Sequence, residues 1–106
     1  MVTFDEFKKL DIRVAKVLEV EDHPNADKLY VLRIDTGTDT RTIVAGIRNF
    51  YKKEELLGRN IVVITNLEPA TIRGVQSNGM LLAASDKNGI CILTPDKNPL
   101  PGSKIS

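Results

Sequence analysis

The sequence has little cysteine, histidine or aromatic content, and each scarcity excludes a class of protein. Its single cysteine, Cys91, and single histidine, His23, provide neither an internal disulfide nor the ligands of a closed zinc site. With no tryptophan, two tyrosines and three phenylalanines, it has few rings on which splayed bases could stack. No apolar run approaches the roughly 20 residues that span a bilayer, and the first residues show no signal-peptide pattern. We therefore expect no metal, no cofactor, no membrane association and a cytoplasmic location.

The charge is nearly balanced, although it is unevenly distributed. A net charge of +1 at pH 7 is low for a protein that binds polyanions irrespective of sequence. All six arginines nevertheless come before residue 74. Two interpretations stay open: the arginines share one basic face, or they are scattered and solvated. The length of 106 residues and the 42% hydrophobic content indicate a single globular domain.

The hydrophobic pattern predicts short strands and two short helices. Thr3 and Glu6 form a capping-box pattern that predicts a helix over 4–9. The apolar alternation that follows slips by one step near Ala15–Lys16, which predicts a bulge or coil in a long first strand. We expect further strands over 29–35, 41–47, 60–65 and 80–84, a turn over 23–27 and a second helix over 52–58.

The order of these elements is that of an OB-fold, an all-β, five-stranded Greek-key barrel with a short helix between strands three and four. We expect the helix and barrel to occupy residues 4–85 of one domain, and 86–106 to form a C-terminal extension. In OB-folds the ligand lies across strands two and three, between the loop joining strands one and two and the loop joining strands four and five. Here those loops are HPNADK (23–28) and the long segment 66–79.

The segment 66–79 is the most informative part of the chain. A loop of this length is uncommon in a small β-domain unless it binds something. Arg73 offers a planar fork of donors suited to a phosphate or a base edge, and Asn66 and Ser77 add neutral hydrogen-bonding groups. This combination suits a nucleic acid. The alternative is an ordinary connection in which proline and glycine serve as turn residues.

The candidate RNA-binding residues are basic or polar side chains expected on or beside the face of strands two and three. Arg33 alternates with Leu32 and Ile34, which places it on the barrel exterior. Ser77 either bonds a ribose or phosphate, or bonds its own loop, and Asn66 either contacts RNA or caps the loop. We expect His23 to fix the first loop by hydrogen bonding. The complete set is Lys28, Arg33, Arg41, Arg48, Lys52, Asn66, Arg73 and Ser77.

The segments DIRVAKV, HPNADKLYVLRID, RTIVAGI, NLEP and RGVQSNGMLLAA resemble the tRNA-binding domain family, and the similarity runs from about Phe4 to Ile105. That family includes the C-terminal domain of many methionyl-tRNA synthetases and stand-alone structure-specific tRNA-binding proteins. The ending PDKNPLPGSKI is most similar to the synthetase version. The resemblance implies an OB-fold that binds tRNA by shape and backbone, raises the tRNA affinity of a synthetase and associates with the catalytic part of methionyl-tRNA synthetase.

The resemblance also implies a homodimer, formed by the N-terminal helix and the residues after 86. Ile90, Ile92, Leu93 and Leu100 either form this seam or close the end of the barrel. Family members often carry basic residues where this chain has Glu68–Thr71, so we expect modest affinity per subunit. Dimerisation would compensate by adding a second contact.

Two other classes of function compete with this interpretation. Relatives of the fold act as secretion-associated chaperones that bind peptides, but they lack a clear HPNADK motif. An enzyme is disfavoured because the chain shows no nucleophile beside a base, no supported carboxylate pair and no phosphate-cradling loop. The chain is therefore expected not to be catalytic by itself, whether it is a whole protein or a fragment of a synthetase.

Overall fold

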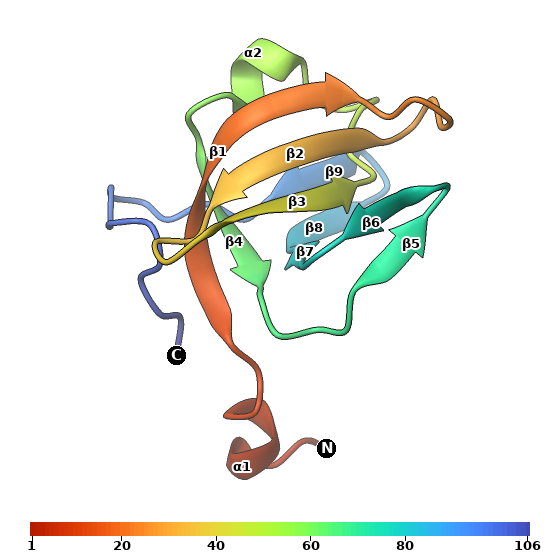
Figure 1. Cartoon of the computed structure of the whole chain (residues 1–106). Coiled ribbons are helices and arrows are strands. Elements are labelled where there is room, and N and C mark those ends of the chain that lie inside the picture. Colours follow the sequence, from red (N-terminus) through yellow and green to blue (C-terminus); the bar gives the residue numbers. More distant parts are fainter.

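The chain folds into a strongly curved, antiparallel five-stranded sheet, which a computed structural model describes over residues 1–106 (Figure 1). β3 and β7 lie at the two edges of this sheet, and the amide of Asn78, just before β7, donates to the carbonyl of Thr42 in β3 at 2.9 Å. The sheet is thereby nearly closed into a barrel, as predicted. In spatial order the strands are β3 (Thr40–Ala45), β2 (Tyr30–Asp35), β1 (Ile12–Asp22), β4 (Asn60–Ile64) and β7 (Met80–Leu81).

The long strand β1 serves two partners in succession. Its first half pairs with β4 and its second half with β2, and Lys16 is opposite a residue of each. The predicted bulge is present, but it lies between Val17 and Glu19, about two residues beyond the expected position near Ala15–Lys16. The physical reason is that Ala15 and Lys16 keep their register with β4, and the extra residue is inserted only after β1 has changed partner.

The two helices are single turns. α1 (Phe4–Phe7) begins with the predicted capping box, in which the Glu6 amide donates to the Thr3 hydroxyl at 3.2 Å. α2 (Lys53–Leu56) buries Leu56 in the barrel core. Both are shorter than predicted, and neither is long or apolar enough to cross a membrane.

Two predictions on the second half of the chain are wrong. The segment 66–79 is not one irregular loop, because β5 (Ala70–Ile72) and β6 (Val75–Ser77) form a hairpin within it. The expected strand 80–84 is split, because Leu82 lies between β7 and a second hairpin. That hairpin consists of β8 (Ala83–Asp86) and β9 (Gly89–Ile92).

The core fills the inside of the barrel with aliphatic side chains. Leu32, Ile34 and Ile43 are fully buried with their counterparts on β1 and β4. Ile92 belongs to this core and Ile90 packs against it, so these two residues close the barrel. Their role is the second of the two alternatives that the sequence left open. Leu93 and Leu100 are exposed instead, at 42% and 80%.

The C-terminal tail is part of the packed body. Its backbone bonds to the first half of β1: the Gly102 amide donates to Val14 at 2.7 Å and the Ile105 amide donates to Ile12 at 2.8 Å. Ile105 also packs on a small apolar cluster outside the barrel, which contains Ile12 and Ile64. The tail therefore covers the flank of β1 that β2 does not reach.

Candidate nucleic-acid interface

A polar groove crosses the outer surface of β2 and β3. It has a volume of about 390 Å³, and its walls are the two strands on one side and the 66–79 segment on the other. Arg33 of β2 lies opposite Thr42 of β3, and both side chains face this groove. Leu67 is the one hydrophobic residue in its lining. Such a surface suits a charged, hydrated ligand better than an apolar one.

Arg33 is the basic group best placed in this groove. It is exposed, as predicted, and one terminal nitrogen of its guanidinium donates to the Thr40 hydroxyl at 2.9 Å. It makes no ion pair within the chain. On the β1 side the surface turns acidic, because Glu19 and Glu21 line an adjoining hollow. An anion in the groove would therefore lie toward β3 and the 66–79 segment.

The wall of the groove is held by a buried histidine. The His23 Nε2 atom lies 2.9 Å from the carbonyl oxygen of Ile72 in β5, and its Nδ1 atom accepts a hydrogen bond from the Asn25 amide at 3.0 Å. This arrangement requires the neutral ring with its hydrogen on Nε2. The prediction that His23 fixes the first loop is confirmed, and the structure adds that it ties this loop to the β5–β6 hairpin.

Arg73 forms the tip of that hairpin, together with Gly74. Both residues have positive φ angles, 52° and 92°, as a two-residue hairpin turn requires. The Arg73 guanidinium donates to the Asn25 carbonyl at 3.1 Å, and the Asn25 side chain donates to the Arg73 carbonyl at 3.1 Å. These reciprocal bonds join the HPNADK loop to the tip of the β5–β6 hairpin.

Ser77 connects the hairpin to the barrel. Its buried hydroxyl accepts from the Val44 amide at 2.9 Å and donates to the Gly79 carbonyl at 3.0 Å. The sequence left two roles open for Ser77, which were a bond to a ribose or phosphate and a bond to its own loop. In the structure its hydroxyl bonds its own loop. Its contribution to the groove is to position β6 beside β3.

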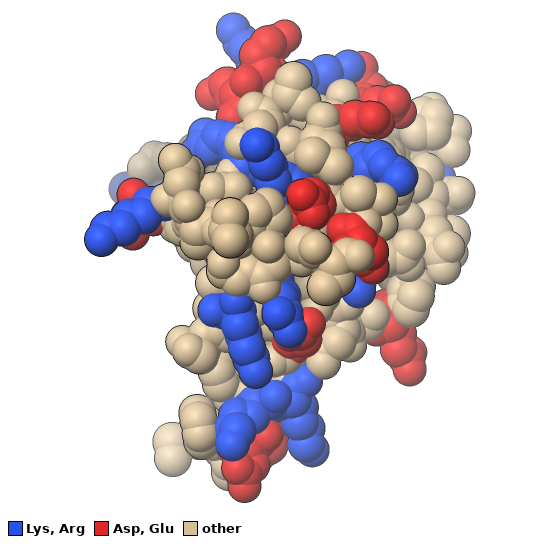
Figure 2. Space-filling view, turned by 60° about the vertical axis from the view of Figure 1, so that its left-hand side comes forward, with Lys and Arg blue, Asp and Glu red and all other residues tan.

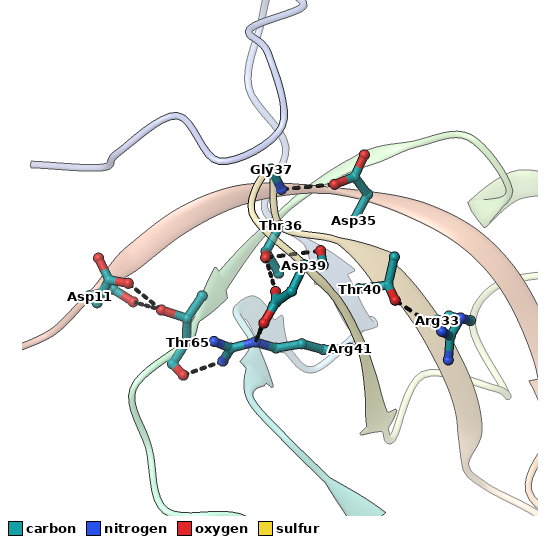
Figure 3. A network of polar contacts seen from close by, with 9 residues as sticks. All are labelled: Asp11, Arg33, Asp35, Thr36, Gly37, Asp39, Thr40, Arg41 and Thr65. Carbon is teal, nitrogen blue, oxygen red and sulfur yellow. Dashed lines mark hydrogen bonds and ion pairs between the residues drawn. The ribbon is translucent and has the colours of Figure 1, made fainter.

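Three further candidates have side chains engaged in the fold. The Asn66 amide oxygen accepts from the Asp11 amide at 2.8 Å and its nitrogen donates to the Lys9 carbonyl at 2.6 Å. Arg48 pairs with Asp22 at 3.4 Å. Arg41 pairs with Asp39 at 3.3 Å and points toward the end of the barrel, where it also bonds the carbonyl of Thr65 (Figure 3).

The remaining two candidates, Lys28 and Lys52, are exposed and make no side-chain hydrogen bond or ion pair. Lys28 lies in the first loop, where its carbonyl accepts from the Arg48 amide at 3.4 Å. Lys52 immediately precedes α2. Of the eight predicted residues, only Arg33 and Arg41 line the groove, whereas Lys28 and Arg48 lie together beside the first loop.

Sequence reasoning missed the polar network that closes one end of the barrel (Figure 3). A hydrogen bond from the Thr36 hydroxyl lowers the pKa of Asp39, and the nearby Arg41 lowers it further. The Thr65 hydroxyl lowers the pKa of Asp11 in the same way, assisted by Arg13. Both carboxylates stay charged at neutral pH. The sequence did contain a signal for this network. Side chains two residues apart on a strand lie on the same face, so Arg41 had to share the inward side of the buried Ile43.

Taken together, these observations define an OB-fold domain with a polar groove across β2 and β3. A family model described as a putative tRNA binding domain matches residues 12–104. The chain belongs to this family.

Individual relatives agree with the family match. The chain is 54% identical over 104 residues to the methionine–tRNA ligase of Pyrococcus furiosus, covering 98% of this chain and 14% of that protein. A solved MetRS-related protein from Pyrococcus horikoshii is 32% identical with a TM-score of 0.93, covering 100% of this chain and 98% of that one. The CsaA chaperone protein from Picrophilus torridus is 38% identical with the same TM-score of 0.93 and covers 100% of both chains. The chain thus spans about one seventh of the curated ligase that it matches.

Proposed function

We propose that this chain is a non-catalytic, shape-selective tRNA-binding module that raises the tRNA affinity of a cytoplasmic methionyl-tRNA synthetase, as its C-terminal domain or as a separate subunit. The observation that carries the proposal is the 54% identity to a methionine–tRNA ligase over nearly the whole chain. Such a module acts by keeping tRNA near the catalytic part, through effective concentration and without chemistry of its own.

The groove supplies a physical basis for this role. Arg33 offers a cationic donor in it, and Lys28 and Arg73 add exposed positive charge on the first loop and at the hairpin tip. Ser77 and His23 hold these segments in place. The scarcity of aromatic rings argues against gripping unstacked bases one by one. A rigid groove with few cations fits a folded RNA whose phosphates are already arranged in space.

The direct test is a titration with tRNA at low and moderate salt, set beside an unstructured RNA of equal length. We expect a clear preference for tRNA and a loss of affinity as salt rises, since each neutralised phosphate releases counterions. Equal affinity for the two RNAs would contradict shape selection. No binding to either RNA would overturn the proposed function.

Arg33→Ala is expected to weaken tRNA binding by about fivefold to tenfold and to reduce the salt dependence by about one unit of log–log slope. The reason is that Arg33 is the one arginine of the groove without a carboxylate partner. The measurement is the dissociation constant at several salt concentrations. Arg59→Ala removes the same charge beside α2, where Arg59 bonds the carbonyl of Glu55, and serves as the matched control. Equal losses in the two variants would move the site away from the groove.

We also propose that the chain forms a homodimer through the exposed apolar residues near its C-terminal part. Leu93 and Leu100 support this, because neither side chain belongs to the core clusters of the barrel. Leu93→Glu is expected to halve the mass measured by light scattering, since a buried carboxylate at a seam is costly. Leu57→Glu, at a leucine exposed to 57% beside α2, should leave the mass unchanged. A monomeric mass for the unmodified chain would exclude the dimer.

Peptide binding, as in a secretion-associated chaperone, is the second candidate function. The structural match to the CsaA chaperone protein at 38% identity favours it specifically. The two candidates differ in what competes for the groove. Peptide binding would move to first place if an unfolded peptide displaced bound tRNA from the protein. The same would follow if the protein bound the peptide and did not bind tRNA.

A further inference from the structure

The closed end of the barrel carries a second polar hollow, next to the groove on β2 and β3. It has a volume of about 260 Å³, and none of the residues that line it is hydrophobic. Arg13 of β1 and Arg41 of β3 approach it from two strands, and the tail residues Pro101 and Gly102 form its rim. A hollow of this kind takes a polar or charged group and offers little to an apolar one.

The two arginines are held firmly and still have unused donors. The Arg13 guanidinium bonds Asp11 through Nε at 2.9 Å and the Gly102 carbonyl through Nη1 at 3.0 Å. Arg41 bonds Asp39 through Nε and the Thr65 carbonyl through Nη1. No hydrogen bond engages Nη2 of Arg41, and none engages Nη2 of Arg13. A phosphate oxygen is a suitable acceptor for such a donor.

The charge of these arginines is balanced by Asp11 and Asp39, so the excess positive charge comes from lysines. Lys9 and Lys104 are exposed and make no hydrogen bond or ion pair through their side chains. Backbone contacts tie both lysines to the segments that line the hollow. The Lys9 carbonyl accepts from the side chain of Asn66, the residue after Thr65, at 2.6 Å, and Lys104 pairs with Arg13 in an isolated antiparallel β-bridge. Figure 2 shows Lys and Arg side chains running from the middle of this side of the molecule to its lower end.

The hollow and the groove belong to one continuous surface. Arg41 lines both of them, so a chain of phosphates that passes Arg33 meets the closed end of the barrel next. In the other direction, across β1, Glu19 and Glu21 repel a polyanion. The charges therefore favour one path out of the groove.

We propose that the RNA-binding surface continues around the closed end of the barrel, where Lys9, Arg13, Arg41 and Lys104 contact further phosphates of the same RNA. These four residues are called the barrel-end surface. This inference rests on the proposed tRNA-binding function and assigns that function a second contact surface. It takes phosphodiester groups, because its four side chains are cationic and phosphate oxygens are suitable acceptors for them.

The test uses the double variant Lys9→Gln with Lys104→Gln, which leaves every side-chain hydrogen bond of the fold in place. We expect tRNA affinity to fall about tenfold at low salt and the log–log salt slope to fall by about two. The control is Lys87→Gln with Lys97→Gln, which removes the same charge from the β8–β9 turn and from the tail beside α2. That control should change the slope little, and circular dichroism should show both variants folded.

The outcomes separate this inference from the function on which it rests. If the unmodified chain binds tRNA and the Lys9/Lys104 variant keeps its full salt slope, the barrel-end surface is overturned and the groove stands. If the control pair lowers the slope as much as the Lys9/Lys104 pair, the effect is general charge and the surface is again overturned. If the unmodified chain does not bind tRNA at all, the proposed function itself fails.

Discussion

Gly102→Ala is expected to lower the free energy of unfolding by about 3 kcal/mol. Gly102 has a φ of +89°, and a Cβ atom built on it would lie 2.6 Å from the carbonyl oxygen of Thr36. Backbone cannot give way as a flexible side chain does, so the tail has to move. Two hydrogen bonds would be lost with it: the one from the Gly102 amide to the Val14 carbonyl, and the one from the Arg13 guanidinium to the Gly102 carbonyl. Urea denaturation of the two chains measures the difference.

Gly58→Ala separates the cost of a positive φ angle from the cost of a steric clash with the backbone of Thr36. Gly58 has a similar φ of +80°, but a Cβ atom there would meet nothing within 4 Å. Its substitution is expected to lower the free energy of unfolding by only about 1–2 kcal/mol, the cost of placing alanine in a left-handed backbone conformation. Equal losses of unfolding free energy in the two variants would show that the close contact between Gly102 and Thr36 does not contribute to stability, and would contradict the prediction for Gly102→Ala.

His23→Ala is expected to destabilise the fold by about 2–4 kcal/mol and to weaken tRNA binding together with it. The substitution leaves the Ile72 carbonyl and the Asn25 amide without their partner and opens a space where a buried ring was. The two loops that border the groove would then move independently. Denaturation gives the stability change, and a tRNA titration well below the midpoint gives the change in affinity.

His23→Asn is the informative companion to that variant. The asparagine side-chain oxygen can accept from the Asn25 amide, as Nδ1 of the histidine does, but it is too short to reach Ile72. We expect it to recover about half of the lost stability and little of the lost tRNA affinity. Full recovery of affinity would show that the link between the loops is irrelevant to binding.

The sequence was sufficient for the barrel because its main strands are apolar-rich runs between turn residues, and β2 alternates strictly between buried and more exposed positions. Arg33 lies between Leu32 and Ile34, which are both buried, so the alternation of β2 placed its side chain on the outer face of the barrel. The β5–β6 hairpin escaped prediction because each strand is three residues long and its turn is Arg-Gly, which is outside the usual hairpin dipeptides. The split between β7 and β8 was equally hidden, because Leu82 is apolar whether it continues one strand or lies between two.

The candidate site was harder to predict than the fold, and Arg41, Asn66 and Ser77 show why. Residue type told us that each side chain needs hydrogen-bonding partners, but it did not tell us whether these partners are RNA or protein. The partners of Asn66 are Lys9 and Asp11, more than fifty residues away along the chain. Only the closed barrel brings them within reach. Sequence therefore identified polar residues of consequence, and the three-dimensional structure showed which of them are engaged within the fold.

The pairing of the tail with β1 has a consequence for how the molecule stays separate from its neighbours. The first half of β1 has β4 on one side, and its other side would be an open edge of the sheet if the tail were absent. Open edges of apolar strands recruit strands of other chains and lead to aggregation. By closing this edge, the last six residues, 101–106, protect the domain against unwanted sheet extension as well as stabilising it.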